Sequence, residues 1–259
     1  MGEHGTWFDF LYRFDWYQDF MHSAEGALGR KWTFLMFGPS HFSMTHVYIT
    51  LLVVMFCTYA AFRFHAAVKG AGQSAIVPPP RFDLRHCFEY FCDKVHKEVY
   101  QSLGEENGRK FFPFIGALAL FIFFGNLIGI IPGLASSNDT LKTNVALALM
   151  VFLMTHYYGI KTHGVGAYFK HFMGPMPALY WLIFPIEIIS HLARPISLSL
   201  RLLGNMFADH KVIFTFFTLV PIVIPLPFYA LGLLVCYVQT LVFCLLTLVY
   251  LGGALEHEH

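Results

Sequence analysis

The sequence predicts an all-α integral membrane protein with about five membrane helices and one interfacial amphipathic helix. The last two membrane helices are expected to form a long, strongly tilted hairpin. Of the 259 residues, 56% are hydrophobic and 13% are charged, whereas soluble domains carry about 25% charged residues. The mean hydropathy is +0.56. Apolar runs of the roughly 20 residues that cross a bilayer recur along the chain.

Residues 1–46 are interpreted as an N-terminal interfacial segment on the outer side of the membrane. The first 40 residues alternate aromatic with acidic side chains and are too polar to span a bilayer. Trp7, Phe10 and Trp16 suit the membrane interface. We expect a short amphipathic helix here, followed by a turn at 38–39. No basic region precedes an apolar one at the start, so no cleaved signal peptide is expected.

Residues 47–110 are predicted to hold the first transmembrane helix, at about 47–64, and a cytoplasmic amphipathic helix. Eight of the 17 lysines and arginines fall between residues 63 and 110, and such an excess of positive charge marks the cytoplasmic side. The N-terminus is therefore expected outside. Within 82–99, apolar residues recur at helical spacing opposite charged ones, which is typical of an interfacial helix. A helix in a soluble loop is the alternative.

Residues 111–173 are predicted to form a transmembrane helical hairpin, with spans at about 111–132 and 143–160. Asn126 and Asn144 flank the short turn between them on the outer side. Hydrogen bonding between the helices is the expected role of the two amides. A place on a proton path is the alternative.

Residues 176–259 are predicted to form the long tilted hairpin. After Pro177 at its start, the stretch 176–219 is interrupted only by Pro185 and Pro195, and it would extend about 65 Å as one helix, roughly twice the hydrocarbon thickness. This helix must therefore bend or tilt. The final helix, at about 228–251, contains no Asp, Glu, Lys or Arg, so Gln239 is its main polar candidate. The tail after it is expected on the cytoplasmic side.

One face of the first helix in this hairpin carries a polar stripe. At 100° per residue, residues spaced by three or four fall within a sector about 120° wide. A charge at membrane depth costs at least about 2.5 kcal/mol, so such residues usually carry function. The stripe consists of Glu187, Ser190, Arg194, Ser197, Arg201, Asn205 and Asp209.

Metal, cofactor and nucleic-acid binding are not expected. The 14 histidines include the conceivable pairs His41 with His46 and His163 with His171. No histidine pair has the i, i+4 spacing of a helical zinc site with an acidic partner, so a metal-dependent membrane enzyme is only an alternative. The five cysteines form no CxxC pair. The net charge of +1 lacks the concentrated basic surface that nucleic acid requires.

Four segments carry a resemblance to a known family. They are RPISLSLRLLGNMFA at 194–208, VQTLVFCLLTLVYL at 238–251, FFGNLIGIIPG at 123–133 and NVALAL at 144–149. Together they resemble the a subunits of rotary F-type ATP synthases, the stator half of the proton channel. The resemblance covers about residues 111–253, whereas residues 1–110 match only in general layout. It implies two long, tilted helices that embrace a ring of c subunits.

The resemblance also implies roles for single residues. Arg201 occupies the position of the essential stator arginine and would separate two offset half-channels. Glu187, Asn205 and Gln239 match positions that line these half-channels. The family usually has a titratable residue at the position of Gly232 here.

Most bacterial members have Gly-Glu where this chain has Asp209 and His210. We therefore expect Asp209 to supply the carboxylate that Gly232 cannot. Which of Asp209 and His210 relays the proton in the outer channel stays open. Glu187 and Ser190 are expected at the inner exit. Arg194 is expected there as an anchor or a channel-mouth charge.

These expectations define a function without bond chemistry in this chain. The protein is predicted to conduct protons to and from the c-ring carboxylate and so to couple proton flow to ATP synthesis; Na⁺ remains the other possible ion. Expected partners are the c-subunit ring, the peripheral-stalk b subunits, other ATP synthase subunits and the lipid bilayer. The expected location is a bacterial inner membrane, with the mitochondrial inner membrane second. The alternative function is a secondary transporter or channel in which Arg201 binds an anionic substrate.

Overall fold

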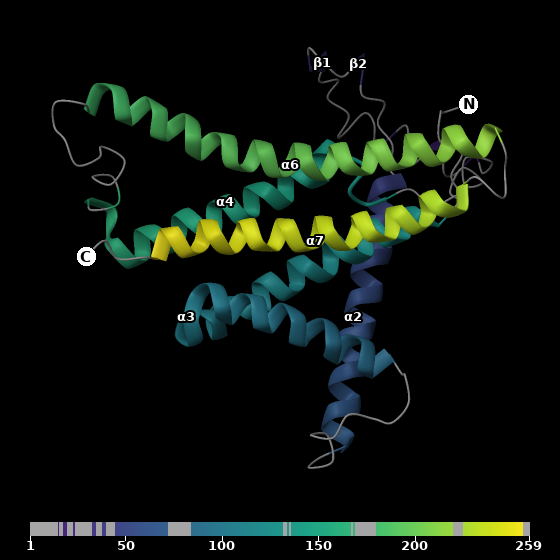
Figure 1. Cartoon of the computed structure of the whole chain (residues 1–259), viewed down its shortest axis with the longest axis horizontal. Coiled ribbons are helices and arrows are strands. Elements are labelled where there is room, and N and C mark those ends of the chain that lie inside the picture. The colour runs from purple at the N-terminus through teal and green to yellow at the C-terminus, as the bar shows by residue number, and fades with distance from the viewer. Residues whose placement is uncertain are drawn as a thin grey trace.

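The computed structural model shows long helices in the order α2, α3, α4, α6 and α7 (Figure 1). Within the described part of the chain, five helices are long and apolar enough to cross a membrane, which confirms the predicted fold class. The described residues are 45–71, 84–131, 134, 136–166, 168, 180–219 and 225–255, with the isolated positions 15, 18–19, 23, 33–34 and 38–39.

The N-terminal part differs from the prediction at one point. Strand β1 (Thr33–Phe34) pairs with strand β2 (Gly38–Pro39) in an antiparallel ribbon, with Phe34 opposite Gly38. The expected turn at 38–39 is therefore wrong, because these residues form a strand that pairs with β1. The amphipathic helix expected within residues 1–40 lies almost wholly outside the described residues.

Helix α2 (Thr45–Ala71) contains the predicted first span and continues seven residues beyond it. Helix α3 (Leu84–Ile130) contains both the predicted amphipathic helix and the second span. The two are joined directly at Gly104, where φ is 74° and ψ is −179°, a conformation that glycine adopts without steric cost. The halves then pack together, with the Phe91 and Phe123 rings 6.0 Å apart. The amphipathic helix thus lies against the span that follows it.

Helix α4 (Leu141–His163) is the predicted third span, and its C-terminal end is followed by Gly164 in the left-handed region. Helix α6 (Tyr180–Leu219) runs for 40 residues, with Pro185 and Pro195 inside it. Helix α7 (Pro225–Leu255) completes the hairpin. At 1.5 Å per residue, α6 is about 60 Å long.

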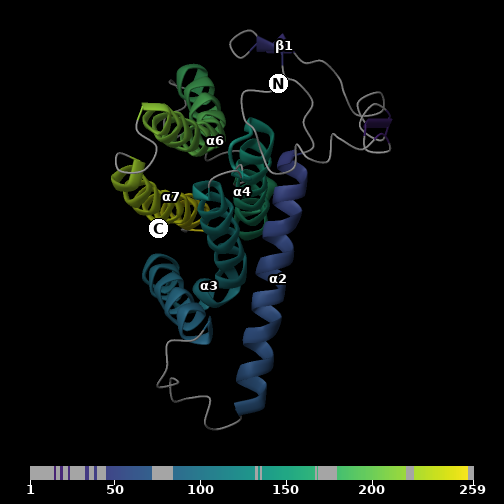
Figure 2. The ribbon, with the colours of Figure 1, turned by 90° about the vertical axis from the view of Figure 1, so that its right-hand side faces the viewer.

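The orientation of the hairpin relative to α2 follows from the two ribbon views. Helix α2 runs vertically in both, whereas α6 and α7 run horizontally in Figure 1 and are seen nearly end-on in Figure 2. If α2 stands upright in the membrane, α6 and α7 must therefore be strongly tilted. A strong tilt also accommodates a helix about twice as long as the hydrocarbon layer is thick.

The core that holds the hairpin lies between α3, α4, α6 and α7. Leu202 of α6 is fully buried and Phe243 of α7 is 1% exposed. They pack in one cluster with Ile122 of α3 and Val151 of α4. Burying such side chains away from surrounding lipid is favoured by close packing rather than by the hydrophobic effect. This cluster sets the rotation of α6 and thereby the direction of its polar face.

Candidate functional site

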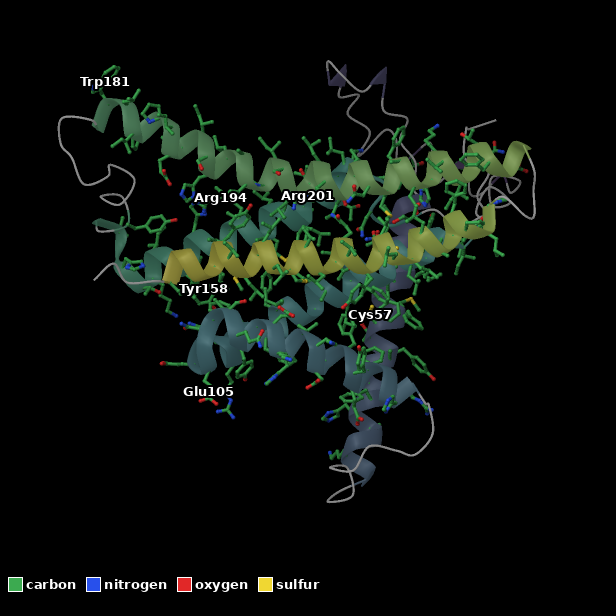
Figure 3. All side chains as sticks on the ribbon, viewed as in Figure 1. Cys57, Glu105, Tyr158, Trp181, Arg194 and Arg201 are labelled. Carbon is green, nitrogen blue, oxygen red and sulfur yellow. The ribbon has the colours of Figure 1, made fainter. Side chains whose placement is uncertain are left out.

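The position of Arg201 is set by the buried side chains beside it on α6. Leu198 is 2% exposed and Leu202 fully buried, so both point into the core. Arg201 precedes Leu202 by about 100° of helix rotation and is only half-buried. Figure 3 shows Arg194 and Arg201 along α6. Across the described residues, no hydrogen bond or ion pair reaches the Arg201 guanidinium. Its charge is therefore available to a group from outside.

Asn205, one turn beyond Arg201, connects α6 to α7. Its Nδ2 donates a hydrogen bond of 2.5 Å to Oε1 of Gln239, which is 3% exposed. The Nε2 of Gln239 is buried and has no partner among the described residues. A buried amide donor left unpaired is costly. The structure thus brings together the predicted site residues Asn205 and Gln239. The Nε2 of Gln239 remains available to donate a hydrogen bond to a further group.

Asp209 lies against the backbone of α7 at Gly232. A Cβ atom on Gly232 would come within 2.7 Å of Asp209 Oδ2, closer than such atoms can approach. The carboxylate therefore fills the space that a side chain at position 232 would occupy. This contact supports the sequence-based expectation that the carboxylate comes from α6 instead of α7.

His210 points in a different direction from its neighbour Asp209, because successive helical side chains are rotated by 100°. Its Nε2 lies 3.0 Å from the carbonyl oxygen of Gly129 at the end of α3. A carbonyl can only accept, so this nitrogen carries the hydrogen. Nδ1 lies 3.7 Å from Oδ2 of Asp139. His210 therefore has a carboxylate neighbour of its own, which the sequence pattern did not indicate.

Gly129 allows this approach because it lacks a side chain. A Cβ atom there would come within 3.0 Å of His210 Nε2 and 2.6 Å of Ser136 Cβ.

The nearby turn between α3 and α4 is held by buried amides. Asn138 Nδ2 donates to Asn126 Oδ1 at 2.6 Å, and Asn144 Nδ2 donates to the Asn138 carbonyl at 2.8 Å. Asn126 and Asn144 therefore do form hydrogen bonds, but to Asn138 in the turn and not directly from one helix to the other as expected.

The N-terminal half of α6 carries the other polar residues of the stripe. Glu187 Oε1 lies 3.2 Å from Nε2 of His191, one turn further on. The guanidinium of Arg194 lies 5.1 Å from the ring centre of Tyr250 on α7, within the range of a cation–π contact. Ser190 and Ser197 are exposed. The polar residues of the stripe therefore contact different groups before and after Arg201.

Sequence reasoning missed three ionisable residues that the structure adds to these groups, namely Asp139, His156 and His191. The Glu187 and His191 spacing of four residues was a readable signal, because such residues are neighbours on a helix. Asp139 and His156 had no comparable signal, since each meets α6 only through tertiary packing.

No site for a metal ion forms in the part of the chain that the structure describes. There, no group of three or more His, Cys, Asp or Glu side chains is close enough to hold one. His41 and His171, from the two conceivable pairs, lie outside the described residues.

The fold and this stripe define a class, namely multi-pass helical membrane proteins with ionisable side chains at membrane depth. Such side chains mark ion or substrate pathways. Comparison with protein families matches residues 41–252 to the family described as ATP synthase A chain. The chain belongs to this family.

Individual relatives agree with the family match. The chain is 39% identical to an ATP synthase subunit a of Bdellovibrio bacteriovorus over 232 residues, which cover 88% of this chain and 99% of the relative. It is 56% identical to an ATP synthase subunit a 1 of Syntrophotalea carbinolica over 68% of this chain and 74% of the relative. A Sulfurihydrogenibium subunit a is 40% identical over 82% and 96% of the two chains.

Membership makes the chain a proton-translocating stator subunit in the membrane sector of an ATP synthase. Its long apolar helices and bacterial relatives indicate a multi-pass protein of a bacterial inner membrane. Nothing in these matches favours the transporter alternative in which Arg201 binds an anionic substrate.

Proposed function

We propose that Arg201 separates two proton half-channels, each lined by one half of α6. The observation that carries this proposal is a half-exposed guanidinium, without a described partner, between two groups of polar residues on one helix. Glu187, Ser190 and Arg194 belong to the inner half-channel. Asn205, Asp209, His210 and Gln239 belong to the outer one.

The chemistry of arginine suits a separator. Its guanidinium stays charged at any accessible pH, so it stabilises an ionised rotor carboxylate that passes it. In hydrocarbon the same carboxylate must be protonated, because an unpaired charge there is prohibitively costly. The fixed positive charge also opposes direct proton transfer between the half-channels. Each rotor carboxylate must therefore give up its proton on one side and regain one on the other.

Proton exchange in the outer half-channel is proposed to use Asp209 as the relay. The close approach of Asp209 to Gly232 supports this choice. His210, between Gly129 and Asp139, is then a second exchange group further from α7. The driving force is the proton-motive potential, worth about 2.3 kcal/mol per charge per 100 mV.

The proposed partners are the c-subunit ring, which would face the hairpin of α6 and α7, and the peripheral-stalk b subunits. The N-terminus is placed outside and the C-terminus in the cytoplasm, as the basic residues between 63 and 110 suggest. We assign these features to four segments of the chain. They are the outer interfacial segment 1–46, the first span and amphipathic helix 47–110, the hairpin 111–173, and the proton-path hairpin 176–259.

The proposal is tested with the whole complex purified through a tag on this chain. We expect a ring of small two-helix subunits to co-purify. After reconstitution in vesicles, an imposed proton gradient should drive ATP synthesis, and added ATP should drive proton uptake. A chain that purifies without such a ring, or a complex that moves no protons, would overturn it.

A further inference from the structure

Two histidines from different helices meet beside Glu187. The His191 ring of α6 and the His156 ring of α4 lie 5.3 Å apart, centre to centre, at an interplanar angle of 78°. His191 Nε2 is 3.2 Å from Glu187 Oε1, and the His191 side chain is only 13% exposed. Three proton-exchanging groups therefore follow one another, from the partly exposed carboxylate to the α4–α6 interface.

The hydrogen bonds assign a proton to one nitrogen of each ring. His156 Nδ1 lies 2.9 Å from the carbonyl oxygen of Phe152, which only accepts, so Nδ1 carries the hydrogen and Nε2 exchanges protons. His191 Nε2 faces the Glu187 carboxylate and donates to it when that group is ionised. His156 is thus held through Nδ1 and His191 through Nε2.

A small cavity adjoins both rings. The space available to the centre of a water molecule is about 10 Å³, close to the least that holds one water. Besides apolar residues of α4 and α6, its lining includes Thr155, His156, His191, Arg194 and Tyr250. A single water there would lie among polar side chains that come from three helices. It would bridge two imidazoles that do not hydrogen-bond each other directly.

Charged groups from three helices surround the two rings. From α6, the Glu187 carboxylate lies 3.2 Å from Nε2 of His191, and Arg194 lines the same cavity. From α4, the His156 ring lies 5.3 Å from that of His191, centre to centre. From α7, Tyr250 contacts Arg194 and keeps that charge at the cavity. Two positive charges on neighbouring imidazoles would repel each other, which disfavours double protonation of the pair.

A further titratable group near His156 is Tyr168, which follows α4. Its ring centre lies 6.0 Å from that of His156. Burial raises the pKa of Tyr168, with Arg194 acting in the opposite direction, so its phenol stays neutral near pH 7. It leaves the histidines as the exchanging groups on this side.

We infer that His156, His191 and Glu187 form a proton relay in the inner half-channel. The inference rests on the proposed function and adds two groups to it. His191 lies ten residues before Arg201 on α6, about 15 Å along the helix. Protons are exchanged from group to group through the cavity water, and none is consumed. The inner half-channel then has two parts. One is an opening at Glu187, and the other is the pair of imidazoles between α4 and α6.

The test uses the intact ATP synthase reconstituted in vesicles, with His156→Gln, His191→Gln and the double variant. Gradient-driven ATP synthesis and ATP-driven proton pumping are measured from pH 5.5 to 8.5. We expect each single variant to lose about tenfold in rate, below the roughly 10² to 10⁴ that positioned proton-transfer groups can contribute. The double variant should lose no more than either single one, because the groups act in series.

The pH profile separates a relay from a structural role. If the histidines relay protons, the shape of the pH profile should differ between the wild type and the variants, whereas a purely structural role would lower the rate alike at every pH. His65→Gln, which alters an exposed histidine of α2, is the control and should match the wild type. Variants with an unchanged rate and profile, or with a rate loss at an unchanged profile, overturn the relay. A wild-type complex that moves no protons would instead overturn the proposed function.

Discussion

The two halves of α6 on either side of Arg201 meet different kinds of neighbour. In the C-terminal half, Asn205 bonds to Gln239 and Asp209 lies against Gly232, both on α7. His210 reaches the end of α3 at Gly129. The N-terminal half has exposed serines at 190 and 197 and a glutamate paired within its own helix. One half is enclosed by the chain, and the other is more open.

This difference indicates how much of each half-channel the chain can build alone. The groups of the C-terminal half come from α6, α7, α3 and the turn after α3, so their arrangement is a property of this fold. Among the described polar side chains of the N-terminal half, His191 and Arg194 make ring contacts with other helices. Its exposed positions need a rotor, lipid or water to complete them, which the proposed inner half-channel would provide.

A similar contrast separates the two helices of the hairpin. The most apolar stretch of α6 is 11% buried within the chain, whereas that of α7 is 39% buried. Helix α7 lies against α3, α4 and α6. Large apolar side chains of α6, such as Ile189 and Ile196, are exposed. Helix α6 therefore presents more surface for lipid or a partner than α7 does.

The largest expected effect is that of Arg201→Ala, which removes the charge between the two halves. We expect gradient-driven ATP synthesis to be abolished while the complex still assembles, because the side chain has no described partner that its loss would leave unpaired. Synthesis by reconstituted complexes is the measurement. Arg194→Ala, which loses the contact with Tyr250, should keep part of the rate. Normal synthesis by the Arg201 variant would refute the separator role.

The next effect distinguishes the two neighbours of the C-terminal half. Asp209→Asn should slow proton flux more than His210→Ala, because Asp209 takes the place of a side chain at Gly232 on α7. Proton uptake by reconstituted vesicles measures both. The reverse order of fluxes would assign the relay to His210 and its neighbour Asp139.

A smaller effect is expected when a methyl group is placed on α7. Gly232→Ala should displace the Asp209 carboxylate, since the new Cβ would lie 2.7 Å from Oδ2, and should lower proton flux only partly because the carboxylate remains. The matched control is Gly253→Ala on the same helix, where a Cβ meets nothing within 4 Å. Equal fluxes in the two variants would show that the position of Asp209 is unimportant.

The smallest expected effect concerns stability. Asn205→Leu, Gln239→Leu and the double variant form a cycle around the hydrogen bond between these amides. Such bonds in membrane proteins average about 0.6 kcal/mol and reach about 1.7 kcal/mol. The free energy of unfolding should therefore show coupling of this size, with the double variant less destabilised than the sum of the single ones. Strictly additive losses would mean that the bond contributes nothing.

Much of the fold could be predicted because it depends on local composition. The spans now seen as α4 and α7 were anticipated to within a few residues, since apolar runs of bilayer length identify them. The direct junction at Gly104 was not anticipated, because a glycine among charged residues is equally compatible with a loop. The paired strands at 33–34 and 38–39 were missed for a related reason, since a Gly-Pro sequence usually indicates a turn.

The candidate site could be predicted only in part. The stripe from Glu187 to Asp209 follows from helical rotation alone. His210 lies about 100° from Asp209 on the helix, and no pattern indicated that it would meet Gly129, 81 residues earlier. His156 was equally hidden, because its neighbour His191 lies on another helix. Contacts between helices depend on how each helix is rotated and crossed.

The sequence by itself determined that this chain lies in a membrane, that its long helices follow in this order, and that one face of α6 is polar. Each of these depends on residues close together along the chain and on the fixed geometry of the helix. Only the tertiary structure decided which group each polar side chain meets. Core residues such as Leu202 and Phe243 set the rotation of α6 against α7, and that rotation brings Asp209 to Gly232 and leaves Arg201 half-buried.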